Sequence, residues 1–409
     1  MPANSSPDYL RFLAHWDRDE EALREAISAS AGVDVMFRGT PIPTDTAALF
    51  NMFARDPLDA VTEQEDGSLV LPYHPWIAYR NIVEETYLGD VKAPLHAKVS
   101  MPYHWVPGPL RLAIYPLIAG TSRASATGCP PHPAWPIEPR LDSFRSVLYE
   151  GLTESKESTT SSPSGPWPGG RRYVFMMTHD IDTKEGMKRA GQVLDEMVEL
   201  GLKPCFFLVA HGYRWDEGFC DAVRQAGGEI ALHGDTHDNR IAFESRERIA
   251  KRLDSCREVI ERHHIVGFRS PSLLVSDTLY EEVGSRFAWD SSVPDCDTNT
   301  LIGARRGCGT IFPYRRGETI VLPITMPADD RLLLLGYRGM DLLGLLRRKW
   351  QYVREVGGLC HFLTHPEPHL FGKNVIRDLF RALIQEALDQ EDCWIATPSM
   401  VASHWRSLE

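Results

Sequence analysis

RYVFMMTHDID, residues 172–182, is the stretch from which the fold of this chain is best predicted. Its first part is almost entirely apolar, as expected for a strand that is covered on both faces. A polar cluster follows at the end of this strand and contains Asp180 and Asp182. Two carboxylates two positions apart can divide the work of binding a metal ion and removing a proton. An aspartate in such a place is often only a helix cap, so the interpretation needs support from the rest of the chain.

Short apolar runs alternate with amphipathic helical patterns from residue 171 to the end of the chain. The first helical pattern carries Met187, Ala190, Leu194 and Met197 on one stripe and ends at Gly201. Further apolar runs occupy residues 205–210, 229–232, 265–268, 319–322, 359–364 and 394–397. This alternation predicts a parallel α/β domain, and a barrel is the architecture that fits its length.

The first 152 residues follow no such alternation. Ser6 and Pro7 mark the start of one helix, and the rest is irregular, rich in proline and aromatic residues, and without a catalytic motif. Residues 153–170 are rich in serine, threonine, proline and glycine, which is typical of a linker. We therefore predict an α/β or irregular accessory domain of unknown role over 1–152, a linker over 153–170, and a catalytic domain over 171–409.

The composition excludes several classes of protein. The 409 residues include 44 Lys and Arg against 56 Asp and Glu, which gives a net charge of −12 and argues against a nucleic-acid-binding protein. No apolar run reaches the roughly 18 residues that a membrane span requires. The N-terminus lacks the pattern of a secretion signal, and the eight cysteines form no CxxC pair. We therefore expect a protein of the reducing cytoplasm, with no nucleic-acid partner and no membrane span. The sequence does not indicate its oligomeric state.

A second polar cluster, HGDTH, spans residues 233–237 and directly follows the apolar run EIAL. Its two imidazoles, at His233 and His237, can reach one cation if the turn between them is helical, and neutral histidine suits zinc. A lone histidine at such a place would more often be structural. With a carboxylate from another strand end, the pair provides three ligands and leaves a position open for water, as catalytic zinc sites do.

Three more polar clusters follow apolar runs, and each has a structural alternative. Arg269 lies in FRSPS and is either a surface residue or a guanidinium that holds a carboxylate in its charged form. Asp290 lies in WDSS, where a helix cap is the simpler interpretation. His361 and His365 share one face of the run that ends in LTHP. We expect His365 to point into the mouth of the barrel and His361 to be buried and structural.

Taken in order, these five clusters resemble the motifs of the polysaccharide deacetylase family, known as carbohydrate esterase family 4. The family motifs are a threonine–aromatic–aspartate strand end, two histidines four residues apart, an Arg-x-Pro, an aspartate-bearing segment and a Leu-x-x-His type. The resemblance covers about residues 171–409. It implies a distorted (β/α)7 barrel and metal-dependent hydrolysis of an amide or an ester.

Carried over residue by residue, the resemblance implies three metal ligands and four catalytic residues. The ligands of one divalent ion, with zinc expected, are Asp182, His233 and His237. The catalytic residues are the base Asp180, Arg269 that orients it, the general acid His365, and Asp290 that supports His365.

The chain departs from the family pattern in two places. His179 stands at the aromatic position of the first motif, where it could either pack or contact the substrate. A long insertion, residues 296–355, separates the fourth and fifth motifs and weakens the assignment of Asp290. We expect this insertion to shape the substrate pocket.

The sequence thus predicts a metal-dependent hydrolase that removes an N-acetyl or other acyl group from a carbohydrate or sugar precursor. The alternatives are hydrolysis of an amide in a small non-sugar nitrogen compound, and a carbohydrate-binding relative without turnover. The expected substrate is an acetylated amino sugar, either free or linked to a nucleotide or phosphate. Four arginines of the insertion could recognise phosphate or could be solvated surface charges. They are Arg305, Arg306, Arg315 and Arg316.

Overall fold

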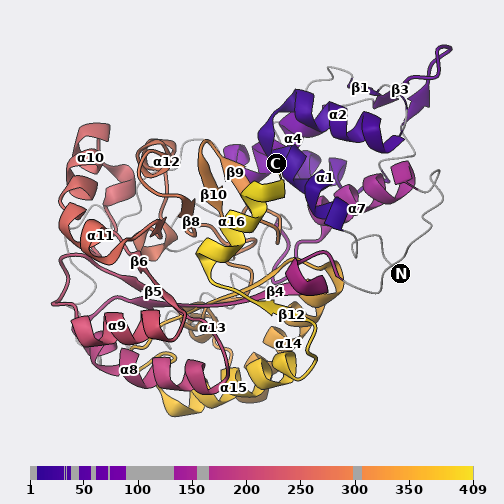
Figure 1. Ribbon diagram of the computed structural model, residues 1–409. Helices are drawn as coiled ribbons and strands as arrows, with labels where there is room; N and C mark the ends of the chain where they lie inside the picture. The colour runs from indigo at the N-terminus through magenta and orange to yellow at the C-terminus, as the bar shows by residue number, and fades with distance from the viewer. Residues whose placement is uncertain are drawn as a thin grey trace.

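The protein is described here from a computed structural model. The described residues are 7–31, 33, 35–37, 46–56, 61–71, 74–88, 133–153, 165–297 and 306–408. A nine-stranded sheet forms the centre of the molecule, and a three-stranded sheet belongs to the N-terminal part (Figure 1). Within the described ranges, no helix combines the length and apolar character that crossing a bilayer demands.

Seven parallel strands of the described chain form the wall of a barrel. They are β4 (Tyr173–Ile181), β5 (Cys205–Leu208), β6 (Glu229–Leu232), β7 (Gly267–Phe268), β8 (Trp289–Asp290), β10 (Thr319–Val321) and β11 (Leu359–Thr364). Their order is β11-β4-β5-β6-β7-β8-β10, and each neighbouring pair is parallel. Strand β4 is buried along its whole length, as its apolar sequence predicts.

The barrel closes between β10 and β11 through irregular backbone. The N–H of Met326, just beyond β10, donates to the carbonyl of His361 at 3.0 Å, and the N–H of Leu359 donates to the carbonyl of Ile311 at 2.8 Å. Strand β9 (Tyr314–Arg316) pairs antiparallel with β10, and β12 (Cys393–Ile395) pairs with the first residues of β4. This irregular closure is the distortion of the barrel, and the predicted distorted (β/α)7 architecture is confirmed.

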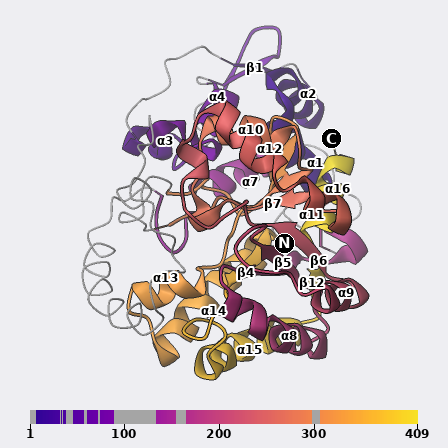
Figure 2. The ribbon, with the colours of Figure 1, turned by 90° about the vertical axis from the view of Figure 1, so that its left-hand side faces the viewer.

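Helices and short 3-10 turns connect the strands. They are η4 (Pro168–Gly170), α8 (Lys184–Glu199), α9 (Glu217–Gln225), η5 (Ile241–Phe243), α10 (Arg246–Asp254), α11 (Arg257–His263), η6 (Pro271–Leu273), α12 (Asp277–Gly284), α13 (Asp329–Leu334), α14 (Gly339–Val356), α15 (Asn374–Leu388) and α16 (Pro398–Leu408). Helices α8, α14 and α15 lie on one side of the barrel in both views (Figures 1 and 2). The predicted apolar stripe of α8 is buried, and Thr183 caps this helix by accepting a hydrogen bond from the N–H of Gly186.

The N-terminal part forms a small α/β unit beside α16 and β9 (Figure 1). Its elements are α1 (Pro7–Arg18), α2 (Glu20–Ala31), β1 (Val35–Phe37), α3 (Thr46–Met52), β2 (Thr62–Glu63), β3 (Leu69–Leu71), α4 (Pro75–Val83), η2 (Thr86–Leu88) and α7 (Arg140–Thr153). Buried polar contacts join it to the barrel. The carboxylate of Asp142 accepts hydrogen bonds from the hydroxyl of Thr310 at 2.7 Å and from the N–H of Ile311 at 3.0 Å.

The segment predicted to be a linker is described only in part. Ser6 and residues 154–164 lie outside the described residues, and the proposed domain boundaries stay a prediction. At the far end of the segment, Trp167 is buried and stacks near Trp394 and Trp405. Its indole N–H donates to the carbonyl of Gly357 at 2.6 Å. Trp167 therefore packs against the barrel, whereas Gly169 and Gly170 are exposed.

Candidate metal centre and active site

Six of the predicted site residues meet at the carboxyl ends of the barrel strands, where α/β barrels carry their active sites. Asp180 and Asp182 come from the end of β4, His233 and His237 follow β6, Arg269 follows β7, and His365 follows β11. All six are buried.

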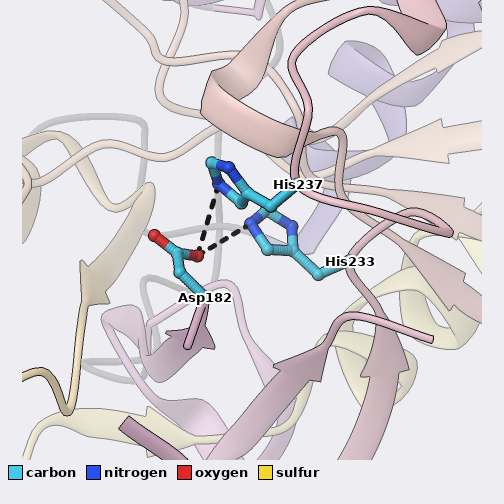
Figure 3. A group of neighbouring side chains, drawn as sticks. All are labelled: Asp182, His233 and His237. Atoms are coloured by element: carbon cyan, nitrogen blue, oxygen red, sulfur yellow. Dashed lines mark ion pairs between the residues drawn. The ribbon is translucent and has the colours of Figure 1, made fainter. Parts of the chain in front are cut away.

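The three predicted metal ligands face one another (Figure 3). Oδ1 of Asp182 lies 3.3 Å from Nε2 of His233 and 3.4 Å from Nε2 of His237. One ligand atom from each residue falls within 4.8 Å of the other two. The prediction that these residues come together is therefore confirmed in geometry.

The donor set fits a divalent cation. Nδ1 of His233 donates a hydrogen bond to the carbonyl of Arg269 at 3.0 Å. This leaves Nε2 of His233 available as a metal ligand. Oδ1 of Asp182 is buried and has no hydrogen bond of normal geometry among the described residues. Burial opposes ionisation of Asp182, but the imidazoles of His237 and His233 outweigh it and hold the pKa of this carboxyl well below its usual range. Two imidazoles and one carboxylate are a zinc ligand set with an open position.

Asp180 is held by Arg269, as predicted. Nη1 of Arg269 donates to Oδ1 of Asp180 at 2.7 Å, while Oδ2 of Asp180 faces Nε2 of His233 at 3.5 Å. The guanidinium is itself fixed, because Nε and Nη2 donate to the carbonyl and hydroxyl of Ser291, each at 2.7 Å. It also lies 3.9 Å from the ring centroid of Phe207. Arg269 therefore holds one oxygen of Asp180 and leaves the other directed toward the metal ligands.

His365 is supported by Asp329, which is the first residue of α13. Nδ1 of His365 donates to Oδ1 of Asp329 at 2.7 Å, and Oδ2 of Asp329 accepts from the N–H groups of His365 at 3.0 Å and Phe371 at 2.8 Å. Burial lowers the pKa of His365, but the Asp329 carboxylate outweighs it and keeps the pKa well above its usual value. Asp329, Asp330 and His365 also lie close enough together to surround a cation. Both carboxylate oxygens of Asp329 already accept hydrogen bonds, so we interpret Asp329 as the residue that positions His365 and not as a metal ligand.

The predicted role of Asp290 is wrong. Its carboxylate accepts from the N–H of Ser292 at 2.8 Å and from the hydroxyl of Ser292 at 2.6 Å, and Tyr280 donates to it at 3.4 Å. Asp290 thus stabilises its own turn, and burial raises its pKa to about 6. His365 takes its carboxylate partner from the insertion, 36 residues before it in the chain.

Two further histidines at the site are structural. His179 stacks on Phe206 with ring centroids 4.8 Å apart, and its Nδ1 lies 2.7 Å from the hydroxyl of Thr364. Burial lowers the pKa of His179 to about 3, so this ring is neutral and serves packing. Nδ1 of His361 lies 2.9 Å from the carbonyl of Pro323, which confirms the expected buried role.

The arginines of the insertion do not gather at the site. Arg315 and Arg316 pair with the first residues of β10, at the amino end of the barrel strands. Arg316 forms an ion pair with Asp277 and lies 3.9 Å above the ring of Tyr280. Arg315 and Arg316 therefore lie at the end of the barrel opposite the candidate site, which favours the alternative in which they do not bind a substrate phosphate. The main chain of Arg306 is tied to Glu85 of the N-terminal unit at 2.7 Å, and Arg305 lies outside the described residues.

Sequence reasoning missed Glu367, which links two of the active-site loops. Oε1 of this buried carboxyl accepts from the N–H groups of Asp182 at 3.1 Å and Thr183 at 3.2 Å. Burial and the charge of Asp182 raise its pKa to about 8. A Cβ at Gly186 would collide with the same oxygen, so a larger residue there would displace the Glu367 carboxyl. The short distance along the chain from His365 is the signal that could have drawn attention to Glu367.

Comparisons with known proteins show the fold. No protein-family model matches the chain, and no curated protein matches it either. A solved structure of a Mycobacterium smegmatis protein assigned as a polysaccharide deacetylase is 20% identical, with a TM-score of 0.50, over 61% of this chain and 95% of that one.

Two further structures are similar at lower scores. A Pseudomonas aeruginosa PAO1 protein with the same kind of assignment is 15% identical, with a TM-score of 0.49, over 61% of this chain and 96% of that one. An allantoinase is 16% identical, with a TM-score of 0.47, over 61% of this chain and 96% of that one. The barrel of this chain thus has the fold seen in the Mycobacterium smegmatis protein, in agreement with the resemblance of its sequence motifs.

Proposed function

We propose that this chain belongs to the polysaccharide deacetylases and is a metal-dependent hydrolase that removes an N-acetyl or other acyl group from a carbohydrate or sugar precursor. The observation that supports this most strongly is the buried group of Asp182, His233 and His237. This group lies at the same end of the barrel as the Asp180–Arg269 pair and the His365–Asp329 pair. Metal ligands, base and acid are all present, which favours an enzyme over a carbohydrate-binding relative without turnover.

The residues divide the reaction between them. A divalent ion held by the three ligands would lower the pKa of a bound water and polarise the acyl carbonyl. Oδ2 of Asp180, the oxygen that Arg269 leaves free, accepts the proton of the attacking water. Nε2 of His365 then gives a proton to the departing nitrogen, because Nδ1 is held by Asp329. The products are a free amine and a short carboxylate, most simply acetate.

The proposed substrate is a small acetylated amino sugar. Arg315 and Arg316 lie at the opposite end of the barrel. They therefore give no reason to favour a nucleotide-linked sugar over a free one. We place the enzyme in the cytoplasm. This is supported by the seven cysteines of the described residues, each of which is free and buried.

The function is tested by measuring acetate release from the zinc-loaded protein. The panel contains soluble N-acetylated sugars, nucleotide sugars, insoluble chitin and peptidoglycan. A small cyclic amide, whose hydrolysis opens the ring and releases no acetate, is assayed separately by mass spectrometry of the product. We expect acetate from a soluble acetamido sugar and a slower reaction in His365→Ala at unchanged metal content. Hydrolysis of the cyclic amide alone would favour the small-amide alternative. Metal binding without turnover on any substrate would favour a carbohydrate-binding protein.

A further inference from the structure

The loop that carries both imidazole ligands is not helical. Residues 233–239 form an irregular turn between β6 and η5, and not the helical turn that would place two histidines four residues apart on one face. Backbone contacts hold its beginning, where the N–H groups of Ala210 and His211 donate to the carbonyls of Gly234 at 3.1 Å and Asp235 at 2.8 Å. A further anchor of the part that carries His237 comes from a side chain of another element.

Arg252 of α10 supplies that anchor. Its Nε lies 2.9 Å from both carboxylate oxygens of Asp235, and its Nη2 lies 2.7 Å from one of them. The same Nη2 lies 2.9 Å from the hydroxyl of Thr236 and 2.9 Å from Oδ1 of Asp238. Nη1 faces Glu244 at 3.4 Å. One guanidinium thus touches the residues on both sides of His237, and a planar donor group of this kind fixes geometry as well as charge.

The charges around this guanidinium give it a second effect. Asp235, Asp238 and Glu244 place three carboxylates around one cation, and the side chain of Arg252 is only 13% exposed. Asp235 is two residues from each imidazole ligand and is itself buried. Without Arg252, its carboxylate would be an unpaired buried charge. The guanidinium occupies both oxygens of Asp235.

We propose that Arg252 is a positioning residue of the metal centre. It fixes the loop of His237 through Asp235, Thr236 and Asp238. The inference rests on the proposed metal-dependent function, since it assigns Arg252 a role toward the ion held by Asp182, His233 and His237.

The test is the zinc dissociation constant, measured by competition with a chromophoric chelator on the full chain. Arg252→Met should weaken zinc binding about 10- to 100-fold, as loss of a residue that orients metal ligands usually does. Arg252→Lys should bind zinc with intermediate affinity, because it keeps the charge without the planar donor group. Arg347→Met is the matched control, since Arg347 pairs with both oxygens of Glu386 at 3.0 and 2.9 Å between α14 and α15. Its zinc affinity should equal that of the wild type.

A double-mutant cycle identifies the residue through which Arg252 acts. Asp235→Asn and Arg252→Met should weaken zinc binding by less in combination than the sum of their separate effects, because both remove the same contact. Zinc binding by folded Arg252→Met at wild-type affinity would overturn the inference and leave the proposed function standing. If Arg252→Met does not fold, wild-type affinity in both Arg252→Lys and Asp235→Asn would overturn it. A wild type that binds no zinc would instead contradict the proposed function.

Discussion

Nδ1 of His365, at the end of β11, lies 2.7 Å from Oδ1 of Asp329, at the start of α13. The histidine belongs to a sequence motif, whereas the aspartate comes from the insertion that precedes it. Asp329 raises the pKa of His365, which favours the protonated imidazole that a general acid requires. The insertion thereby contributes directly to the catalytic end of the barrel.

Replacing Asp329 by asparagine should move the pH dependence of the reaction. A general acid acts while protonated, so activity falls as the pH rises through the pKa of His365. Asp329→Asn removes the charge that raises this pKa, and burial then lowers it. We expect the alkaline limb of kcat/KM to shift to lower pH. Asp290→Asn, measured in parallel, should leave that limb in place. A shift with Asp290→Asn instead would restore the original assignment of Asp290.

Substitutions of Asp180 and Asp182, at the end of β4, should affect metal binding and turnover differently. Asp180→Asn should retain the metal and slow turnover by about two to four orders of magnitude, the range expected for loss of a general base. Asp182→Asn should lose metal affinity as well, because its carboxylate faces both imidazoles. Metal analysis of the purified variants and rates of acetate release test this. Loss of the ion in Asp180→Asn alone would reverse the two assignments.

The buried carboxylate of Asp142, which pairs with Arg145 of its own helix and also contacts the barrel, should matter for stability. The ion pair of Asp142 and Arg145 is fully buried, so Asp142→Ala leaves an unpaired guanidinium and should cost roughly 3–5 kcal/mol of unfolding free energy. Urea unfolding of the full chain measures this. The matched control is Glu386→Ala, which breaks a partly exposed pair and should cost about 0–1 kcal/mol. A loss of unfolding free energy in Asp142→Ala that is as small as the loss in Glu386→Ala would mean that the contacts of Asp142, including those with Thr310 and Ile311, contribute little to stability.

The predicted linker can be tested by limited proteolysis with a protease of broad specificity. The sequence of residues 153–164 is poor in apolar side chains, so the first cuts should fall there. No early cut should follow Trp167, because its indole is buried. Mass spectrometry of the first fragments locates the cuts. First cuts on the barrel side of Trp167 would show that the linker was assigned to the wrong residues.

The sequence correctly predicted those residues whose place in the fold follows from the strand that they belong to or directly follow. The buried strand β4 and the polar residues just beyond each strand end could be placed because parallel strands bring their carboxyl ends to one edge. Asp329 and Arg252 could not, since each reaches the site from a helix whose position depends on packing. The end of the barrel at which Arg315 and Arg316 lie could not be predicted either. Their motif showed charge but not the end of the barrel at which β9 lies.

The account depends most on the metal centre of Asp182, His233 and His237. The most direct measurement is the metal content of the wild type and His237→Ala after dialysis against a weak chelator. His237→Gln serves as a second variant that keeps a polar side chain of similar reach. We predict one divalent ion per chain in the wild type, most of it lost in both variants, and folded protein throughout by circular dichroism. Equal metal content in the three proteins would contradict the assignment.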